Sequence, residues 1–537
     1  MGSEAPEQGA RQAGTLTERA GLVALGTLGS RLLGAVRDAV IAASFALGAT
    51  DAFFVAWTIP NTLRRVLGEG AVSAAFIPLF SEADEQDGRE AARRYFARFF
   101  GALLLLLLVV SAVGAATAPF WATVYAAGYR HDPTKFATTV ELTALVFPYI
   151  LFAGVAALLS GALNALGRFL LPSFSPALLN LSLIAAPIAF VPIAIQLGLS
   201  PVAGLAIGAL VGGAMQVLVQ LPSLRREGMP ALPSFALRDA RVRQSLLLMA
   251  PLLLGTGVHQ INILLSRLFA SYLPTGAQSY LYYGQRLVEI PQGMFAMAVA
   301  SAALPSLARL RSQEKHEEAR DALRYSVQLS LFVAIPAAVA LAVLAEPTVT
   351  VIFGRGAFAH GAVVQTARSL VWLAAGVWAV AISHALTRMY YAYNDTRTPV
   401  WCAAANLVTF VALSAKLGFS LGHVGLAIAT TGAAMVQLLL LALLLRRRTG
   451  PLGWGPILKA GLRCGVAGAV MALVVHDLAT LGDWSRGGND AWNLGIYAFT
   501  ALFGLAVYAA ASYLLRSPEL TQIAGALTRR WRAPQSP

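Results

Sequence analysis

The sequence predicts an all-α polytopic membrane protein of about fourteen transmembrane helices, arranged as two pseudo-symmetric six-helix lobes followed by two further helices. Of its 537 residues, 57% are hydrophobic and 12% are charged, whereas a soluble domain carries roughly 25% charged residues. Its mean hydropathy is +0.66. The apolar runs, such as 101–113 and 433–445, are long and lack the alternation of a membrane β-barrel strand.

A transmembrane helix needs about 20 apolar residues to cross the hydrocarbon of a bilayer, which is about 30 Å thick. Its backbone must also satisfy its own hydrogen bonds there, which favours helices. We expect spans at residues 20–44, 52–80, 99–125, 139–165, 171–196, 201–223, 245–270, 277–306, 325–353, 364–392, 398–417, 423–446, 456–477 and 492–515.

The lysines and arginines in the connections and at the ends of these spans are divided unequally between the two sides of the membrane. The side that holds the N-terminus has 26 of them, and the opposite side has only Arg130, Lys135, Arg355, Lys416 and Arg486. Because basic connections stay in the cytoplasm, we expect an even number of spans with both termini cytoplasmic. The net charge of +14 is therefore mainly a matter of topology, and we expect no nucleic-acid partner.

Two proline pairs indicate an internal repeat at an offset of 227 residues: Pro78 with Pro305, and Pro172 with Pro399. Six spans per repeat would give the copies the same orientation, with a central cleft as the transport site. The predicted layout is a cytoplasmic tail at 1–19, a first lobe at 20–224, a cytoplasmic linker at 225–244, a second lobe at 245–446, two additional helices within 447–515, and a cytoplasmic tail at 516–537.

Several function classes find no support in the sequence. Cys402 and Cys464 lie inside apolar runs without metal-ligand spacing. No glycine precedes a lysine, so there is no P-loop. The first eighteen residues contain no apolar signal core. No catalytic triad or paired carboxylates stand out, and Asp395 is expected to cap the helix that follows it. We therefore expect neither an enzyme nor a bound cofactor.

Arginines within the predicted spans are the main functional signal, because a charged side chain there costs at least about 2.5–3.5 kcal/mol on insertion scales. Local pairing accounts for part of the set: Arg37 stands beside Asp38, Arg65 precedes Glu69 by four residues, and Arg286 precedes Glu289 by three. Arg31 has no acid within four residues. Guanidinium groups bind phosphate in a bidentate manner, so an anionic, phosphorylated substrate is expected.

The segment from Ser30 to Pro78 contains SRLLGAVRDAV and TDAFFVAWTIPNTLRRVLGEGAVSAAFIP. It resembles the opening of the MurJ (MviN) lipid II flippases, of the multidrug/oligosaccharidyl-lipid/polysaccharide exporter superfamily. FPYILF at 147–152, LNALGRFLLPSFSPALLN at 163–180, QRLVEIPQG at 285–293, GRGAF at 354–358 and NDTRTPV at 394–400 also match. The resemblance covers most of the first twelve spans, and fourteen helices in this arrangement are that family's plan.

The resemblance implies a multi-pass flippase of the bacterial cytoplasmic membrane. Its partners would be membrane lipid and lipid II, the undecaprenyl-pyrophosphate-linked disaccharide peptide used in cell-wall synthesis. The family's cavity residues fall on Arg31, Arg37, Arg64, Arg286, Asp51, Glu69 and Ser279. Two positions depart from relatives: Thr58 stands where some have lysine, and Gln285 stands where an acid is frequent.

A coupling cation is a further partner that the resemblance raises. The family is described with a sodium site between spans 7 and 11. Here span 7 offers His259, Gln260 and Asn262 but no carboxylate.

Two other functions remain open. A small-molecule antiporter on the same fold would need buried carboxylates in mid-span for ion coupling, and the sequence has few. A polyprenyl-phosphate-using membrane transferase would need a large outer loop with acids or histidines, whereas the outer loops are mostly short.

The charge division predicts which connections a membrane-impermeant thiol reagent reaches in intact cells. Cysteines introduced as Ser81→Cys and Ser312→Cys should resist the reagent, and Thr134→Cys should react with it. Labelling of the first two from outside would overturn the predicted orientation.

Overall fold

The computed structural model describes residue 26 and residues 29–66, 72–230, 232–236, 239–255, 257–292, 316–450 and 453–522. Within these residues the secondary structure is helical, without a β-strand. Ten helices are long and apolar enough to cross a membrane, which confirms an all-α polytopic membrane protein. The remaining predicted spans, at 20–44, 52–80, 245–270 and 277–306, each include undescribed residues, so the count of fourteen stays a prediction.

The chain divides into two compact units, residues 1–260 and residues 261–537. The first unit contains a helix over residues 29–44 and then α2 (Leu47–Val66), α3 (Val72–Gln86), α4 (Arg89–Ala116), α5 (Ala118–Tyr125), the short η2 (Ala127–His131), α6 (Pro133–Val146), α7 (Tyr149–Ala165), α8 (Leu170–Ala189), α9 (Val191–Gln196), α10 (Ala203–Arg226) and α11 (Ala240–Gly255).

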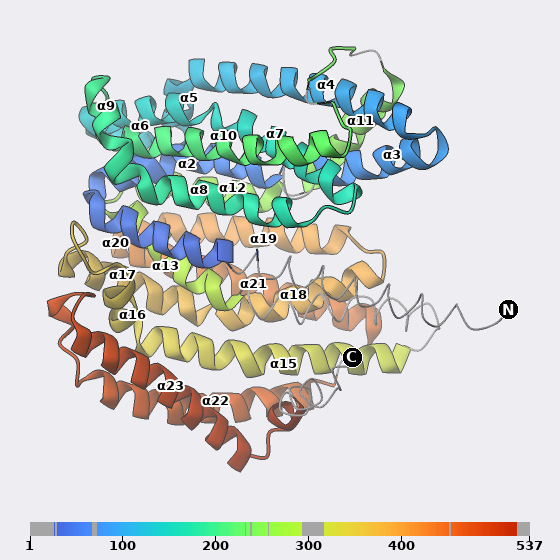
Figure 1. Cartoon of the computed structure of the whole chain (residues 1–537). Helices are drawn as coiled ribbons and strands as arrows, with labels where there is room; N and C mark the ends of the chain where they lie inside the picture. The colour runs from blue at the N-terminus through green and yellow to red at the C-terminus, as the bar shows by residue number, and fades with distance from the viewer. Residues whose placement is uncertain are drawn as a thin grey trace, which may run out of the picture. The chain divides into compact units, whose positions relative to one another are not determined.

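The unit boundary falls inside α12 (Gly257–Ser271). The second unit continues with α13 (Ala277–Pro291), α15 (His316–Val343), α16 (Ala345–Phe353), α17 (His360–Ala375), α18 (Val377–Ala392), α19 (Arg397–Leu413), a π-helical turn η4 (Ser414–Gly418), α20 (Phe419–Leu421), α21 (His423–Thr449), α22 (Trp454–Ala479), η5 (Trp484–Arg486) and α23 (Ala491–Leu514), as Figure 1 shows.

Breaks within long helical segments recur at the offset of the predicted repeat. Thr117 separates α4 from α5, and Leu344 separates α15 from α16, which is 227 positions later. The Phe147–Pro148 break separates α6 from α7, and Gly376 separates α17 from α18. Proline and glycine account for the second pair, because proline lacks a backbone N–H and glycine disfavours a helix interior.

Helices at corresponding positions in the two units also pack on corresponding neighbours. In the first unit α10 packs on α6, α7 and α8, and in the second α21 packs on α17, α18 and α19. In the same way α4 packs on α6 and α7, and α15 packs on α17 and α18. These correspondences support the repeat. Pro305 lies outside the described residues, so its pairing with Pro78 is not compared.

Each unit has its own apolar core. In the first unit aromatic rings of α3 and α4 pack together, with Phe76 contacting Tyr95 and Phe99 at ring-centroid distances of 5.5 and 5.3 Å. In the second unit α15 packs on both α18 and α22, and Tyr508 of α23 donates a hydrogen bond to the Phe332 carbonyl of α15 at 2.8 Å. The two C-terminal helices are thereby integrated into the second unit.

The connection after α10 is held against the first unit. The Ser234 N–H donates to the Ala97 carbonyl of α4 at 2.8 Å, and a Cβ at Gly101 would lie 2.2 Å from the Ser234 carbonyl oxygen. Asp239 caps α11 through the N–H groups of Arg241 and Val242. Its carboxylate also pairs with Arg98 at 2.5 Å. Ser234 and Asp239, within the predicted 225–244 linker, are therefore both bonded to α4.

One loop in each unit is tied to the C-terminal end of a long helix. Between α7 and α8, Arg168 pairs with Glu227, which follows α10, at 2.6 Å. Between α18 and α19, Asp395 pairs with Arg448 in the last turn of α21. Arg168 and Asp395 are 227 positions apart, so the two units use the same tie with opposite charges.

The Asp395 side chain also caps the start of α19, as the sequence predicts. Its carboxylate accepts hydrogen bonds from the N–H groups of Arg397 and Thr398 and from the Thr398 hydroxyl, at 3.0, 3.0 and 2.7 Å. Partial burial disfavours the charged form, but the bonds from Thr398 and the Arg448 guanidinium outweigh it. The pKa of Asp395 therefore lies below its ordinary value of 3.8.

The lowered pKa gives Asp395→Asn a defined pH dependence. A carboxyl group with a depressed folded-state pKa contributes stability above its unfolded pKa of about 3.9, and loses it as pH falls through the folded value. We expect the variant to unfold at lower temperature than the parent at pH 7 in detergent, with the difference shrinking below about pH 4. Asp395→Ala should lose about 1 kcal/mol through the missing cap.

Glu90→Gln, an exposed acid of α4, is the matched control and should show little difference at either pH. A constant difference between Asp395→Asn and the parent across this range would contradict the assignment.

Candidate functional site

The four arginines predicted for the site lie on three helices. Arg31 and Arg37 are on the helix of residues 29–44, Arg64 is on α2, and Arg286 is on α13. Arg31 is exposed, and no hydrogen bond or ion pair joins its side chain to another residue in the part of the chain that the structure describes. Glu69 lies outside the described residues. The first three arginines belong to one unit and Arg286 to the other.

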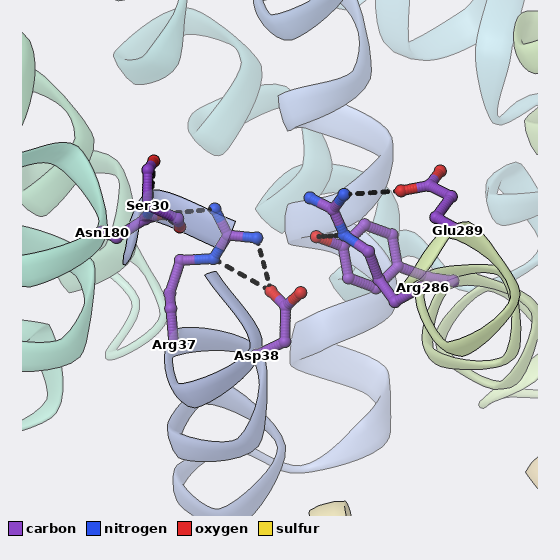
Figure 2. Close-up of polar contacts among 7 residues, drawn as sticks. Ser30, Arg37, Asp38, Asn180, Arg286 and Glu289 are labelled. Atoms are coloured by element: carbon purple, nitrogen blue, oxygen red, sulfur yellow. Dashed lines mark hydrogen bonds and ion pairs between the residues drawn. The ribbon is translucent and has the colours of Figure 1, made fainter. Parts of the chain in front are cut away.

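Arg37 is buried and is the centre of a polar cluster in the first unit. Its Nε and Nη2 atoms donate to one oxygen of Asp38 at 2.9 and 2.6 Å, and its Nη1 atom donates to Asn180 of α8 at 3.0 Å. Asn180 in turn donates to the Ser30 carbonyl at 3.0 Å. Figure 2 shows this guanidinium between Asp38 and Asn180. The predicted pairing with Asp38 is confirmed, so the positive charge of Arg37 is balanced by the adjacent carboxylate.

Arg286 is half-buried in the second unit and is held by its own helix. Its Nη1 atom donates to Glu289 at 2.8 Å (Figure 2), which confirms the predicted pairing three residues apart. Its Nε atom lies 3.4 Å from the Tyr282 hydroxyl, and its guanidinium carbon lies 5.4 Å from the centre of that ring. The Tyr282 contact is a cation–π interaction, which orients the guanidinium group without neutralising it.

Arg64 lies near the end of α2 and is half-buried. Its Nε atom donates to the Asn61 side chain at 3.2 Å. Asn61 follows Pro60, which lies inside the helix. This neutral amide partner helps to orient the guanidinium group of Arg64.

The two remaining predicted residues are deeply buried. Asp51 of α2 is 1% exposed and pairs with Lys135 of α6 at 2.8 Å. Ser279 of α13 is fully buried. Thr58 turns its hydroxyl back to the Phe54 carbonyl at 2.6 Å. That hydroxyl is thus used within the helix.

Asn180 and Lys135 are the residues that sequence reasoning missed. Asn180 ends the motif LNALGRFLLPSFSPALLN, but nothing in its spacing connects it with Arg37, 143 residues earlier. Lys135 appeared as an outer-loop charge, because its position at the start of α6 is clear only from the helix boundary. The signal available in the sequence was whether a charged residue has an oppositely charged neighbour nearby. That signal does not reveal a partner on another helix.

The expected coupling cation has no assigned site among the described residues. Asn262 of α12 donates its side-chain amide to Asn406 of α19 at 2.9 Å. Both partners are neutral, and the described residues contain no cluster of His, Cys, Asp or Glu that could hold a metal ion. No step of transport is therefore assigned to a sodium ion.

Comparison with known proteins identifies the family. The model of the family described as lipid II flippase MurJ matches residues 41–487. The chain belongs to the MurJ lipid II flippase family. It is 35% identical over 507 residues to a probable lipid II flippase MurJ of Vibrio cholerae, covering 92% of this chain and 94% of that one. A lipid II flippase MurJ of Burkholderia cenocepacia is 34% identical, with 86% and 89% covered.

Solved structures agree with the membership in this family. A lipid II flippase MurJ in an inward closed conformation aligns with a TM-score of 0.74 and 25% identity, covering 92% of this chain and 98% of that chain. An inward-facing multidrug transporter of the MATE family and MOP superfamily aligns with a TM-score of 0.63 and 14% identity, covering 79% and 96%. The latter likeness shows the shared fold alone.

Asn180→Ala tests whether the Arg37 cluster stabilises the first unit. It removes the bond from Arg37 and the bond to the Ser30 carbonyl, and hydrogen bonds to charged groups contribute about 1.5–3 kcal/mol. We expect a clear fall in the unfolding temperature in detergent. Ser173→Ala, on the same helix, removes only a hydroxyl bonded to the Phe169 carbonyl and should change little. Equal unfolding temperatures for the two variants would contradict the role of Asn180.

Proposed function

We propose that this protein moves lipid II, the undecaprenyl-pyrophosphate-linked disaccharide peptide, from the inner to the outer leaflet of the bacterial cytoplasmic membrane by alternating access. The observation that carries the proposal is the family match over residues 41–487. The charge division further favours cytoplasmic termini. The layout proposed with it is two six-helix lobes, at 20–224 and 245–446, followed by two helices within 447–515.

The proposed substrate-binding residues are Arg31, Arg37, Arg64, Arg286, Asp51, Glu69 and Ser279. A pyrophosphate carries at least two negative charges, and guanidinium groups bind its oxygens in a bidentate manner. Arg37 and Arg286 are each paired with a carboxylate, so they would direct hydrogen bonds more than add net charge. Arg31 is exposed and has no ion pair with an acid among the described residues, so it would supply the stronger attraction.

Transport of this kind keeps the costly groups out of hydrocarbon. Each polar group without a partner costs several kcal/mol in the bilayer core, so the sugars and pyrophosphate need a polar route. The polyprenyl tail has no such need and can remain in the lipid. The protein would therefore move the headgroup, and no chemical bond is made or broken.

The antiporter alternative is less well supported. It needs buried carboxylates that bind and release a cation, but Asp38 and Asp51, which are buried on the helices nearest the N-terminus, each face a cationic side chain. The likeness to the multidrug transporter concerns fold alone.

The test is rescue of a bacterium depleted of its own lipid II flippase. The parent chain should restore growth, whereas Arg31→Ala, Arg64→Ala and Arg286→Ala should not, although each reaches the membrane in normal amount. Lysine at the same positions should rescue only in part, because it keeps the charge but loses the planar fork.

Arg94→Ala is the matched control, since Arg94 is an exposed arginine of α4 that lies 3.8 Å from Glu90. It should rescue fully. Failure of the parent chain would contradict the proposed function, and full rescue by the three site variants would contradict the residue assignment.

A further inference from the structure

A buried ion pair joins the beginning of α2 to the beginning of α6. The Lys135 ammonium lies 2.8 Å from an Asp51 carboxylate oxygen, and the two side chains are 9% and 1% exposed. The same ammonium lies 4.3 Å from the centre of the Tyr129 ring, within the range of a cation–π interaction. Among the residues predicted for the site, Asp51 is thus held by a lysine that the sequence placed only as an outer-loop charge.

The residues around Lys135 fix its position in the first turn of α6. Asp132 caps α6 by accepting a hydrogen bond from the Lys135 N–H at 3.0 Å, and Pro133 occupies the first turn, where it needs no N–H partner. The preceding η2 turn carries Tyr129, which is buried against Val55 of α2. Val55 and Asp51 are four residues apart and share one face of α2. That face therefore presents an apolar contact and a carboxylate to the same segment.

A buried ion pair is an expensive way to join two helices. Hydrophobic side chains of similar volume are frequently neutral or stabilising replacements for such a pair, because desolvation offsets the Coulomb attraction. Lysine is also a flexible point charge with a large rotamer entropy to lose. Packing alone would favour extending the apolar contact of Val55 and Tyr129. The charge of Asp51 therefore has a use beyond holding α2 against α6.

We propose that Lys135 is a positioning residue for transport, which fixes the direction of the Asp51 carboxylate and balances its charge. This inference rests on the proposed function, because Asp51 belongs to the proposed lipid II site. An anionic pyrophosphate is repelled by a lone carboxylate, but much less by a carboxylate that is half of a neutral pair. By pairing with Asp51, Lys135 thus lowers the electrostatic repulsion between that carboxylate and an anionic substrate.

The experiment compares single and double variants of the full-length chain in liposomes, with lipid II as the probe. Lys135→Met should lower the unfolding temperature and reduce transport per folded molecule by more than about tenfold. Lys135→Arg keeps a cation and should retain most of the transport. The double variant Asp51→Asn with Lys135→Met removes both charges. It should recover the unfolding temperature and still fail to transport.

Arg130→Met is the control, because Arg130 belongs to the neighbouring η2 turn and is an exposed cation bonded to Thr123 at 3.0 Å. It should transport like the parent. Parent-like transport by Lys135→Met, recovery of transport in the double variant, or loss in Lys135→Arg would each overturn the inference. The unfolding temperatures test the pair without lipid II, and failure of the parent chain to transport would contradict the proposed function instead.

Discussion

A charge inside a membrane protein must be balanced by the protein itself, and this constraint organises the polar interior of the chain. Arg37 is balanced by Asp38 and Asn180, and Asp51 by Lys135. In each case the partners come from neighbouring helices or adjacent turns, so satisfying the charge also fixes how those helices pack. Asn61 orients the guanidinium of Arg64 and Tyr282 orients that of Arg286, which is also paired with Glu289.

The balancing residues divide the proposed site into two kinds of group. Arg37 and Asp51 are buried in pairs, and such groups are costly to disturb because breaking a buried pair leaves a charge in a low-dielectric region. Arg31 is exposed, so it can exchange its contacts at a low cost in free energy. A transporter needs both kinds, since one part must keep its shape while another exchanges partners with the substrate.

Much of the fold could be predicted from the sequence, because apolar length and the distribution of basic residues report directly on the membrane. The pairs that are close in sequence were also predictable, as Asp38 next to Arg37 and Glu289 after Arg286 show. Pairs between helices were not. Asn180 and Lys135 were in view, but periodicity gives the face of a helix and not the neighbour it meets. The breaks at Thr117 and Leu344 fall inside the predicted spans 99–125 and 325–353, where apolar length alone did not reveal them.

The opposite polarity of the two loop ties determines which loop each unit can accept. Arg168 faces Glu227 in one unit, and Asp395 faces Arg448 in the other. A chimera that copied the second loop into the first would set an aspartate against Glu227, and the reciprocal exchange would set an arginine against Arg448. Each unit therefore suits the charge of its own connecting loop, and exchanging the two loops would replace both attractions with repulsions.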